Sequence, residues 1–169
     1  MPNYRRLFVP GGTYAFTLCL YDRRADTLVR YIDYFRASYR DVTTHHPVET
    51  IAICILPDHV HMLWALPEDD IDFVNRLRLL KSGFTRRLPP HLKSDGRKGV
   101  RRVWQTRYWE HAIRDEHDLT AHMDYIHWNP VKHGLAASPD EWPHSSWHLY
   151  KSGWNREWKP EMPVLLTEP

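Results

Sequence analysis

Cysteine is scarce in this chain, since only Cys19 and Cys54 occur among its 169 residues. Neither lies at a spacing typical of a metal or redox site, so we interpret both as buried thiols of a protein from a reducing cytoplasm. Long apolar runs are absent as well, the longest being residues 51–56, and the basic N-terminus has no apolar stretch typical of a secretion signal. These absences argue against disulfide-stapled and membrane-spanning proteins. We therefore expect a soluble intracellular protein with no membrane partner.

Acidic residues are almost missing from one part of the chain, although the net charge is only +2. Between residues 76 and 107, eleven basic side chains face a single acidic one, so this part carries about +10 and the remainder about −8. Clustered charge of one sign indicates a polyanionic partner. The alternative is a solvated basic surface that keeps the protein soluble. The eleven are Arg76, Arg78, Lys81, Arg86, Arg87, Lys93, Arg97, Lys98, Arg101, Arg102 and Arg107.

The pattern of apolar residues predicts an alternation of strands and helices. The predicted strands cover residues 13–20, 48–56, 59–66 and 101–113, and the predicted helices cover residues 27–43, 71–88 and 115–128. The order β-α-β-β-α-β-α is typical of an α+β, ferredoxin-like sandwich, in which helices pack on one face of a central antiparallel sheet. The other sheet face would stay partly open to a ligand.

The triplet His59-Val60-His61 follows a Pro-Asp turn and opens an apolar run. In a β-strand, residues two apart stand on one face with Cα atoms roughly 6.6 Å apart, so the two imidazoles could share one metal ion. Val60 would point to the opposite face and into the core, together with Leu63. The same pattern also suits an ordinary half-buried strand with two polar residues on its wet face. A second element is needed to decide between these interpretations.

Residues 115–129 supply that second element. Carboxylates in the first turn and apolar residues three or four apart predict a helix. Tyr125 and Asn129 would then lie one turn apart on the same face, with Asn129 at the helix end because the residue before a proline resists the α conformation. A phenol and an amide oxygen beside two imidazoles suit an attack on a phosphodiester. Taken alone, a tyrosine is more often a packing residue.

Five blocks of the sequence together resemble one family, the first of them made of two N-terminal stretches. They are the N-terminal stretches Asn3–Arg6 and Pro10–Tyr14, the triplet His59–His61, and the runs Trp104–His111, Asp124–Gly134 and Trp142–Ser146. In these blocks and their order the chain resembles REP-associated tyrosine transposases, relatives of single-strand transposases in the HUH endonuclease superfamily. The family often has a large aromatic where Ala15 stands, which we interpret as a change of packing. The resemblance ends near Tyr150, so we expect one nuclease domain at residues 1–150 and a C-terminal tail at 151–169.

The resemblance implies a metal-dependent transposase that cuts and rejoins single-stranded DNA. Tyr125 would attack the scissile phosphate and form a 5′-phosphotyrosine, while His59, His61 and the side-chain oxygen of Asn129 would hold a divalent ion. Two imidazoles and one amide leave the identity of the ion open, and the resemblance points to Mg²⁺ or Mn²⁺. A phenol is a better leaving group than an aliphatic alcohol, so the released 3′-hydroxyl could rejoin the strand without ATP.

The resemblance also implies the DNA partner, a single-stranded hairpin of a repetitive extragenic palindrome (REP) with a short tetranucleotide at its foot. The expected readers of these bases are Tyr4, Arg5 and Arg6, together with the backbone at Gly11 and Gly12. Alternatively, the N-terminal arm serves only to staple the sheet. We expect a monomer in the cytoplasm, associated with the nucleoid. The DNA backbone would be held by Arg78, Lys81, Arg86, Arg87, Lys98, Arg102 and Lys132.

Two other functions stay open. The protein could bind REP hairpins without cutting them, as a repressor or an architectural factor. A metallohydrolase with paired histidines would need further acidic or histidine ligands after the triplet, and Met62-Leu63-Trp64 offers none. Tyr108 is the main rival nucleophile because it lies in another block of the resemblance, but it has no ligand partner at helical spacing.

Overall fold

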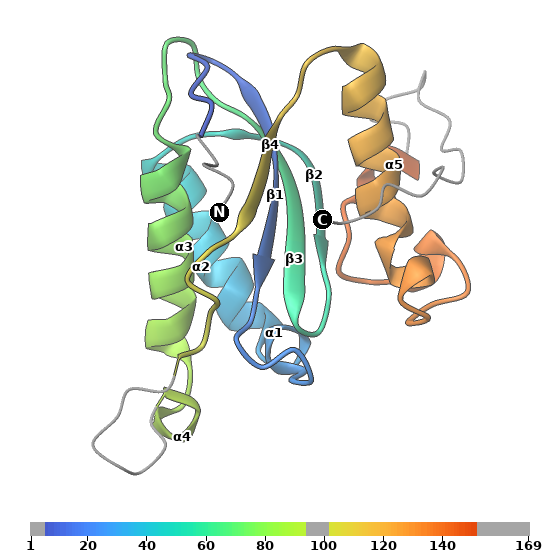
Figure 1. The fold of residues 1–169 in the computed structure, drawn as a ribbon. Coiled ribbons are helices and arrows are strands. Elements are labelled where there is room, and N and C mark those ends of the chain that lie inside the picture. Colours follow the sequence, from blue (N-terminus) through green and yellow to red (C-terminus); the bar gives the residue numbers. More distant parts are fainter. Residues whose placement is uncertain (1–5, 94–101, 152–169) are drawn as a thin grey trace, which may run out of the picture.

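The computed structural model of the chain describes residues 6–93 and 102–151 (Figure 1). Apart from Lys151, the tail expected at 151–169 lies outside these residues. The long elements follow the predicted order: β1 (Thr13–Cys19), α2 (Ile32–His45), β2 (Glu49–Ile55), β3 (His59–Ala65), α3 (Phe73–Arg87), β4 (Trp109–Ala112) and α5 (Glu116–Lys132). The short helices are α1 (Thr27–Arg30), α4 (Pro90–Lys93), η1 (Pro139–Glu141) and α6 (Trp147–Leu149).

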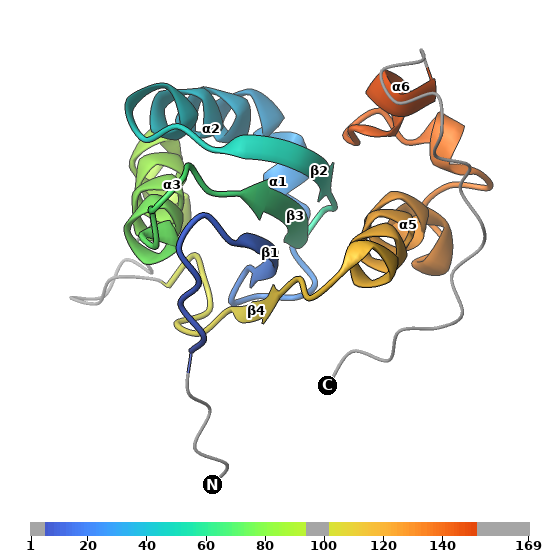
Figure 2. The same ribbon diagram turned by 90° about the horizontal axis from the view of Figure 1, so that it is seen from above.

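The described strands form an antiparallel sheet in the order β2-β3-β1-β4, which confirms the expected α+β, ferredoxin-like class. Strand β3 lies inside the sheet, where His61 is paired with Thr17 of β1 on one side and with Cys54 of β2 on the other. Strand β4 pairs with the remaining side of β1 and forms one edge. Figure 2 shows α2 and α3 on one face of the sheet and α5 on the opposite face.

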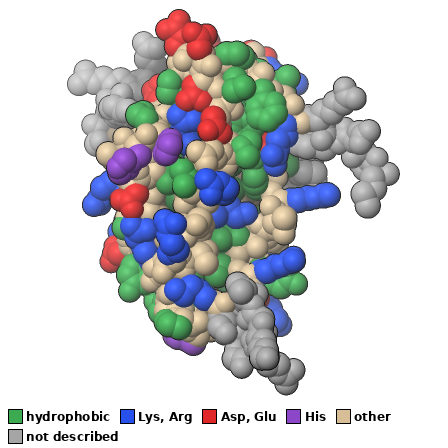
Figure 3. Space-filling model, turned by 90° about the vertical axis from the view of Figure 1, so that its left-hand side faces the viewer, with side chains coloured by type: hydrophobic (Ala, Val, Ile, Leu, Met, Phe, Trp, Pro, Cys, Tyr) green, Lys and Arg blue, Asp and Glu red, His purple; other side chains and the backbone are tan. Residues whose placement is uncertain are grey.

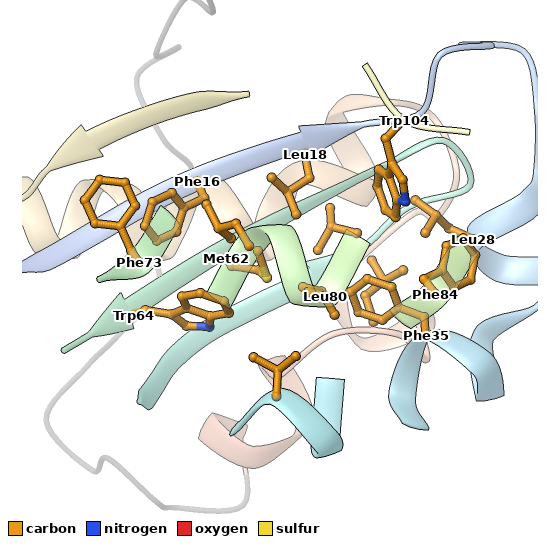
Figure 4. Packing of buried hydrophobic residues seen from close by; sticks show 14 of the residues in the cluster. Phe16, Leu18, Leu28, Phe35, Met62, Trp64, Phe73, Leu80, Phe84 and Trp104 are labelled. Carbon is orange, nitrogen blue, oxygen red and sulfur yellow. The ribbon is translucent and has the colours of Figure 1, made fainter. Parts of the chain in front are cut away.

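The larger core lies between the sheet and helices α2 and α3 (Figure 4). Residues two apart share a face, so Phe16 and Leu18 of β1 point to the same side as Met62 and Trp64 of β3, where Phe84 of α3 meets them. Each of these side chains is at most 1% exposed. Such burial stabilises a fold by roughly 1.5–3 kcal/mol for each large apolar side chain. This face of the sheet therefore supplies most of the stability.

The second sheet face, which we expected to be partly open, carries the histidine pair and lies under α5 (Figure 2). A smaller apolar cluster forms there, and Ala15 of β1 belongs to it together with Met123 and Ile126 of α5. The small side chain of Ala15 thus sits in the packing beneath this helix. Helix α5 is held close enough to the sheet for its side chains to reach the paired histidines.

The prediction that Leu63 shares a face with Val60 is wrong. Val60 belongs to the larger core, whereas Leu63 belongs to the cluster under α5. The reason is the period of two along a strand, which places Leu63 on the same face as His59 and His61. Strand β3 is therefore buried on both faces, and its histidines are surrounded by protein instead of standing on a wet surface.

The predicted helix at 27–43 is broken at Tyr31. Leu28 is fully buried and its backbone N–H donates to Pro57 O at 3.0 Å, so α1 is tied to the turn between β2 and β3. Helix α2 starts anew at Ile32 and packs against α3.

The predicted strand at 101–113 is shorter in the structure, where its described residues form only β4 (Trp109–Ala112). Further upstream, Trp104 still forms an isolated antiparallel bridge with Leu20. The indole of Trp104 turns into the larger core, contacts Phe84 and donates to Lys81 O at 3.1 Å. Trp104 is therefore anchored in the core and does not take part in the continuous pairing of β4 with β1.

Helix α5 continues through Pro130 to Lys132, so the expected end at Asn129 is wrong. A proline inside a helix removes one N–H donor and usually breaks the helix. Here Asn129 and Pro130 are both buried, and the N–H of His133 donates to Asn129 O at 3.0 Å. Tertiary packing of this turn outweighs the local cost of the proline. Lys132 therefore stays on the helix, two turns beyond Tyr125.

Two further findings concern the classes considered from the sequence. Cys54 is buried, Cys19 is half-buried, and neither forms a disulfide with a described residue. Among residues 6–93 and 102–151, no helix is both long and apolar enough to cross a bilayer.

The buried imidazole of His127 predicts a loss of stability in acid. Its Nε2 lies 2.9 Å from Ser146 Oγ, and burial lowers the pKa of His127 from 6.5 to about 3. Below pH 6.5 this histidine is protonated in the unfolded chain but stays neutral in the folded chain. The free energy of unfolding should therefore fall as the pH drops from 6.5 to 3, by up to about 1.4 kcal/mol per pH unit. Urea unfolding of wild type and His127→Gln over this range measures the effect, and equal slopes would contradict it.

Candidate active site and metal centre

The paired histidines stand at the start of β3 and are held by hydrogen bonds at Nδ1. His59 Nδ1 lies 2.7 Å from Asp58 Oδ1, and His61 Nδ1 lies 2.9 Å from Thr17 Oγ1. Both residues are 2% exposed, and their ring centroids are 4.8 Å apart at an interplanar angle of 89°. Because partners at Nδ1 orient the rings, Nε2 of each imidazole is the ring nitrogen placed to bind a metal ion.

Helix α5 brings Tyr125 and Asn129 to this pair. The Tyr125 ring meets His61 edge to face, with centroids 5.3 Å apart. Asn129 is fully buried, and its side chain interacts with His61. The predicted spacing of one helical turn therefore places a phenol and an amide on the face of α5 that looks at the histidines.

The last turn of α5 adds positive charge. Lys132 Nζ donates to Tyr125 Oη at 3.4 Å and lies 4.7 Å from the centroid of its ring. The ring of His133, just beyond the helix, is 5.0 Å from that of His59. Sequence reasoning suggested a phosphate contact for Lys132 but did not foresee its contact with the Tyr125 hydroxyl. The i, i+7 spacing of Tyr125 and Lys132 could have indicated this contact, but the helix was expected to end at Asn129.

Burial and neighbouring positive groups keep His61 neutral. Burial lowers the pKa of His61 well below its ordinary value, and His59, His133 and Lys132 lower it further. Burial alone would raise the pKa of Asp58, but its contacts with His59 and Arg23 bring that pKa below the usual value. The neutral imidazole is the form that binds metal ions. His61 is thus in the form that can bind a cation.

The donor atoms present fit a divalent ion. His59 Nε2 is buried and has no hydrogen-bond partner among the described residues. An unpaired buried polar atom is costly, and a metal ion is one means of satisfying it. The Nε2 of His61 and the side-chain oxygen of Asn129 are likewise shielded from water. Three protein ligands of this kind leave coordination positions for phosphate oxygens.

The rival nucleophile lies elsewhere. Tyr108 belongs to the larger core, where its ring packs 6.4 Å from Phe16 on the sheet face opposite to the histidines. Arg6 lies over this ring at 4.9 Å and forms an ion pair with Glu110 at 3.1 Å. This contact supports the alternative interpretation of the N-terminal arm as a staple of the sheet, at least for Arg6. Tyr4 and Arg5 lie outside the described residues.

The two predicted glycines form a tight turn before β1. Gly11 has φ +64° and its N–H donates to Asp70 O at 2.9 Å, while the N–H of Gly12 donates to Val9 O at 2.9 Å. The turn itself therefore requires glycine, independently of any contact between its backbone and a DNA base.

Substituting Gly12 by alanine should destabilise the protein by about 2–3 kcal/mol. The new Cβ would lie 2.8 Å from Val9 O and 2.9 Å from Val9 Cβ, so that the turn must shift. Gly134→Ala is the matched control, because its φ of +68° adds strain while nothing lies within 4 Å of the added carbon, and about 1 kcal/mol is expected. Urea unfolding measures both variants. An equal or smaller loss for Gly12→Ala would contradict the role given to this turn.

The basic segment lies mainly on and after α3, which covers the sheet face opposite to the histidines. Figure 3 shows numerous Lys and Arg side chains on the side of the molecule that carries this helix. Arg78, Arg86 and Arg102 are exposed there and can reach a polyanion. Lys98 lies outside the described residues.

Three other basic side chains of this segment have partners within the protein. Arg76 is buried and forms an ion pair with Asp70 at 2.6 Å. Lys81 donates to Gln105 O at 2.7 Å, and Arg87 contacts Asp41 Oδ2 at 2.5 Å. Part of the charge asymmetry therefore serves the fold. The sequence could not reveal the contacts of Lys81 and Arg87, because Gln105 and Asp41 are distant from them along the chain.

Sequence reasoning missed a second polar cluster beside the site. His111 of β4 and Asp118 and His122 of α5 place their ligand atoms within 4.8 Å of one another. Burial alone would raise the pKa of Asp118, but hydrogen bonds from His111 and Arg114 hold it well below the ordinary value. Burial lowers the pKa of His122. Only the i, i+4 spacing of Asp118 and His122 could have signalled this cluster from the sequence.

An antiparallel ferredoxin-like sheet with two histidines facing a helical tyrosine is the arrangement expected from the sequence resemblance to single-strand transposases. The family model of IS200-like transposases matches residues 9–129. The chain therefore belongs to the IS200-like transposase family.

Individual relatives place the chain more narrowly. A REP-associated tyrosine transposase of Escherichia coli strain K12 is 39% identical over 160 residues, covering 91% of each chain. A Haemophilus influenzae protein, named as a candidate member of the same group, is 46% identical over 164 residues, covering 91% of this chain and 93% of its own. A solved structure of a REP-associated tyrosine transposase bound to a REP hairpin superposes with a TM-score of 0.82 at 36% identity, covering 98% of this chain and 96% of that one. The resemblance to these transposases is confirmed.

Proposed function

We propose that this transposase binds single-stranded REP hairpins and cleaves and rejoins them through a covalent bond between Tyr125 and a 5′-phosphate. One observation carries the proposal: the Tyr125 ring packs on His61 while Lys132 donates to its hydroxyl oxygen. A tyrosine buried only for packing has no need of a cation at its oxygen. Helix α5 and strand β3 together hold the phenol beside the metal-competent histidines.

In the proposed reaction, Tyr125 Oη attacks phosphorus and the bond to the 3′-oxygen of the preceding nucleotide breaks. The phenolic proton is lost to solvent or to a nearby base, and the leaving oxygen takes up a proton to become a free 3′-hydroxyl. Lys132 stabilises negative charge on the attacking phenolic oxygen, because its ammonium group lies 3.4 Å away. Rejoining is the same exchange in reverse.

The chain's own residues set the geometry of this exchange. Thr17 and Asp58 orient the two imidazoles through Nδ1, and Asn129 completes the donor set from α5. A bound Mg²⁺ or Mn²⁺ would polarise the scissile phosphate and offset the charge that develops on its oxygens. Burial under α5 limits water near Tyr125, which is 9% exposed, and so protects the covalent intermediate from hydrolysis.

The proposed substrate follows from the relatives and from the charge. The solved relative of 36% identity is described as bound to a REP hairpin. Exposed basic residues on the α3 side, including Arg78, Arg86 and Arg102, suit the phosphates of a hairpin stem. We further propose a monomeric protein that acts on the nucleoid in the cytoplasm.

A direct test is the capture of the covalent intermediate. The protein is incubated with end-labelled single-stranded DNA that carries a REP hairpin, in the presence of Mn²⁺ or of a chelator. A labelled band at the mass of protein plus DNA on a denaturing gel, formed only with the metal, is the expected result. Tight hairpin binding without any adduct would instead favour the alternative function of a non-cutting REP-binding protein.

A further inference from the structure

Three rings lie nearly parallel at the exposed edge of the sheet. Trp109 and His111 of β4 have ring centroids 5.9 Å apart at an interplanar angle of 8°, and His111 and His122 of α5 have centroids 4.7 Å apart at 11°. Trp109 is also within 6.0 Å of His122, at 18°. Although it takes part in this stack, Trp109 remains 36% exposed. Its indole can therefore offer aromatic surface to a partner outside the protein.

The stack opens on the same face as the catalytic pair. Trp109 is paired with Thr17 of β1, and Thr17 is paired with His61 of β3, so the three residues form one cross-strand row. Two strand spacings separate the Cα atoms of Trp109 and His61 by roughly 10 Å. His122 stands almost one turn before Tyr125 on α5. A strand of DNA whose phosphate lies at Tyr125 would thus bring a neighbouring nucleotide over the stack.

Ring geometry argues against a metal ion at this second cluster. Parallel imidazoles direct their nitrogen lone pairs side by side, whereas a metal ion needs lone pairs that converge on one point. Asp118 Oδ2 already accepts hydrogen bonds from His111 Nε2 at 2.8 Å and from the backbone N–H of Arg114 at 3.0 Å. These bonds hold His111 in place beneath Trp109. The hydrogen bonds of this cluster thus hold the rings of His111 and His122 in a fixed, nearly parallel arrangement with Trp109.

Flat, fixed and partly exposed rings are suited to nucleobases. A base offers a π face of any sequence, and stacking on an aromatic side chain is a general means of binding single strands. Arg107 and Arg114 flank the stack in sequence and are exposed. Arg114 Nε pairs with Asp118 at 3.1 Å, but its side chain is still 74% exposed, so both arginines suit the phosphates on either side of such a base. The stack thus has both the surface and the charge that a single-stranded nucleotide requires.

Building on the proposed function, we propose that Trp109, supported by His111 and His122, forms a stacking subsite for the base of a nucleotide next to the scissile phosphate. The subsite binds single-stranded DNA without reading its sequence. It fixes the direction in which the strand leaves the active site, and Trp109 acts as a positioning residue for the attack by Tyr125.

The test combines an altered DNA with an altered protein. Hairpin DNA is prepared with an abasic nucleotide at each single-stranded position in turn, and binding is followed by fluorescence anisotropy in the Tyr125→Phe background, which prevents cutting. At one position beside the cleaved phosphate, the missing base should weaken binding on the order of tenfold. With Trp109→Ala added, intact DNA should bind on the order of tenfold more weakly, and the penalty for the missing base should disappear.

Two further variants distinguish stacking from a structural role. Trp109→Phe keeps an aromatic face and should retain most of the affinity and of the abasic penalty. Tyr34→Ala removes an aromatic of similar exposure, 40%, from α2 on the opposite side of the sheet, and should change neither. Should Trp109→Ala fail to fold, the subsite can be tested with Trp109 intact. The fluorescent base 2-aminopurine is placed at each position of the DNA in turn, and its fluorescence should be quenched on binding where it stacks on Trp109.

The outcomes separate this subsite from the proposed function. An abasic penalty that stays the same with and without Trp109, or the absence of 2-aminopurine quenching at every position, overturns the subsite even when wild type forms the covalent adduct. Failure of the wild type to bind hairpin DNA at all overturns both. Loss of the abasic penalty in Trp109→Ala, with Trp109→Phe close to wild type, supports the subsite.

Discussion

Tyr125→Phe should abolish the covalent DNA adduct while leaving hairpin binding within about twofold of wild type. The substitution removes only the hydroxyl that accepts the hydrogen bond from Lys132, and the ring can still pack on His61. Cleavage should fall on the order of 10³-fold or more, because the substitution removes the proposed nucleophile. A denaturing gel measures the adduct, and fluorescence anisotropy measures binding.

Tyr108→Phe is the matched control for this variant. Tyr108 also lies in a block of the family resemblance, but its ring packs with Phe16 in the larger core. The adduct should form at a normal rate in Tyr108→Phe. An adduct that persists in Tyr125→Phe and vanishes in Tyr108→Phe would contradict the assignment of the nucleophile and the role of α5.

His61→Ala should reduce cleavage on the order of 100-fold or more and weaken its dependence on Mn²⁺. His61 touches most of the proposed machinery: Thr17 Oγ1 lies 2.9 Å from its Nδ1, Asn129 interacts with it, and the Tyr125 ring rests against it. Its removal would leave His59 and Asn129 as the remaining protein ligands. The measurement is the cleavage rate over a series of Mn²⁺ concentrations, with higher metal concentrations needed for the residual rate.

Controls separate loss of metal from loss of fold. His117→Ala changes an exposed histidine near the start of α5 and should leave the rate and its metal dependence unchanged. Thermal unfolding checks that His61→Ala still folds, because a buried residue has been truncated. A folded His61→Ala protein with wild-type cleavage and unchanged metal dependence would refute the proposed metal centre.

The two faces of the sheet have different roles. One face packs against α2 and α3 and supplies most of the buried apolar surface, including Phe16 and Trp64. The other face carries the histidines and the rings of β4 under a single helix. Polar groups can be tolerated on this second face because the first one supplies most of the stability. Substitutions at the proposed site should therefore cost activity more than folding.

Local periodicity accounts for what the sequence alone determined. A period of two places His59 and His61 on one face of a strand, and a spacing of four places Tyr125 and Asn129 on one face of a helix. Both pairings hold in the structure because each depends on the geometry of one element. The order of the elements likewise predicted a ferredoxin-like sheet.

Tertiary structure decided how these elements meet. The packing of α5 on the histidine face sets the contact between Tyr125 and His61, and it carries the helix through Pro130 so that Lys132 reaches the phenol. The stack beside Trp109 and the ion pair between Arg87 and Asp41 join residues far apart along the chain. Such contacts follow from strand register and from the burial of apolar faces against each other, which no local spacing encodes.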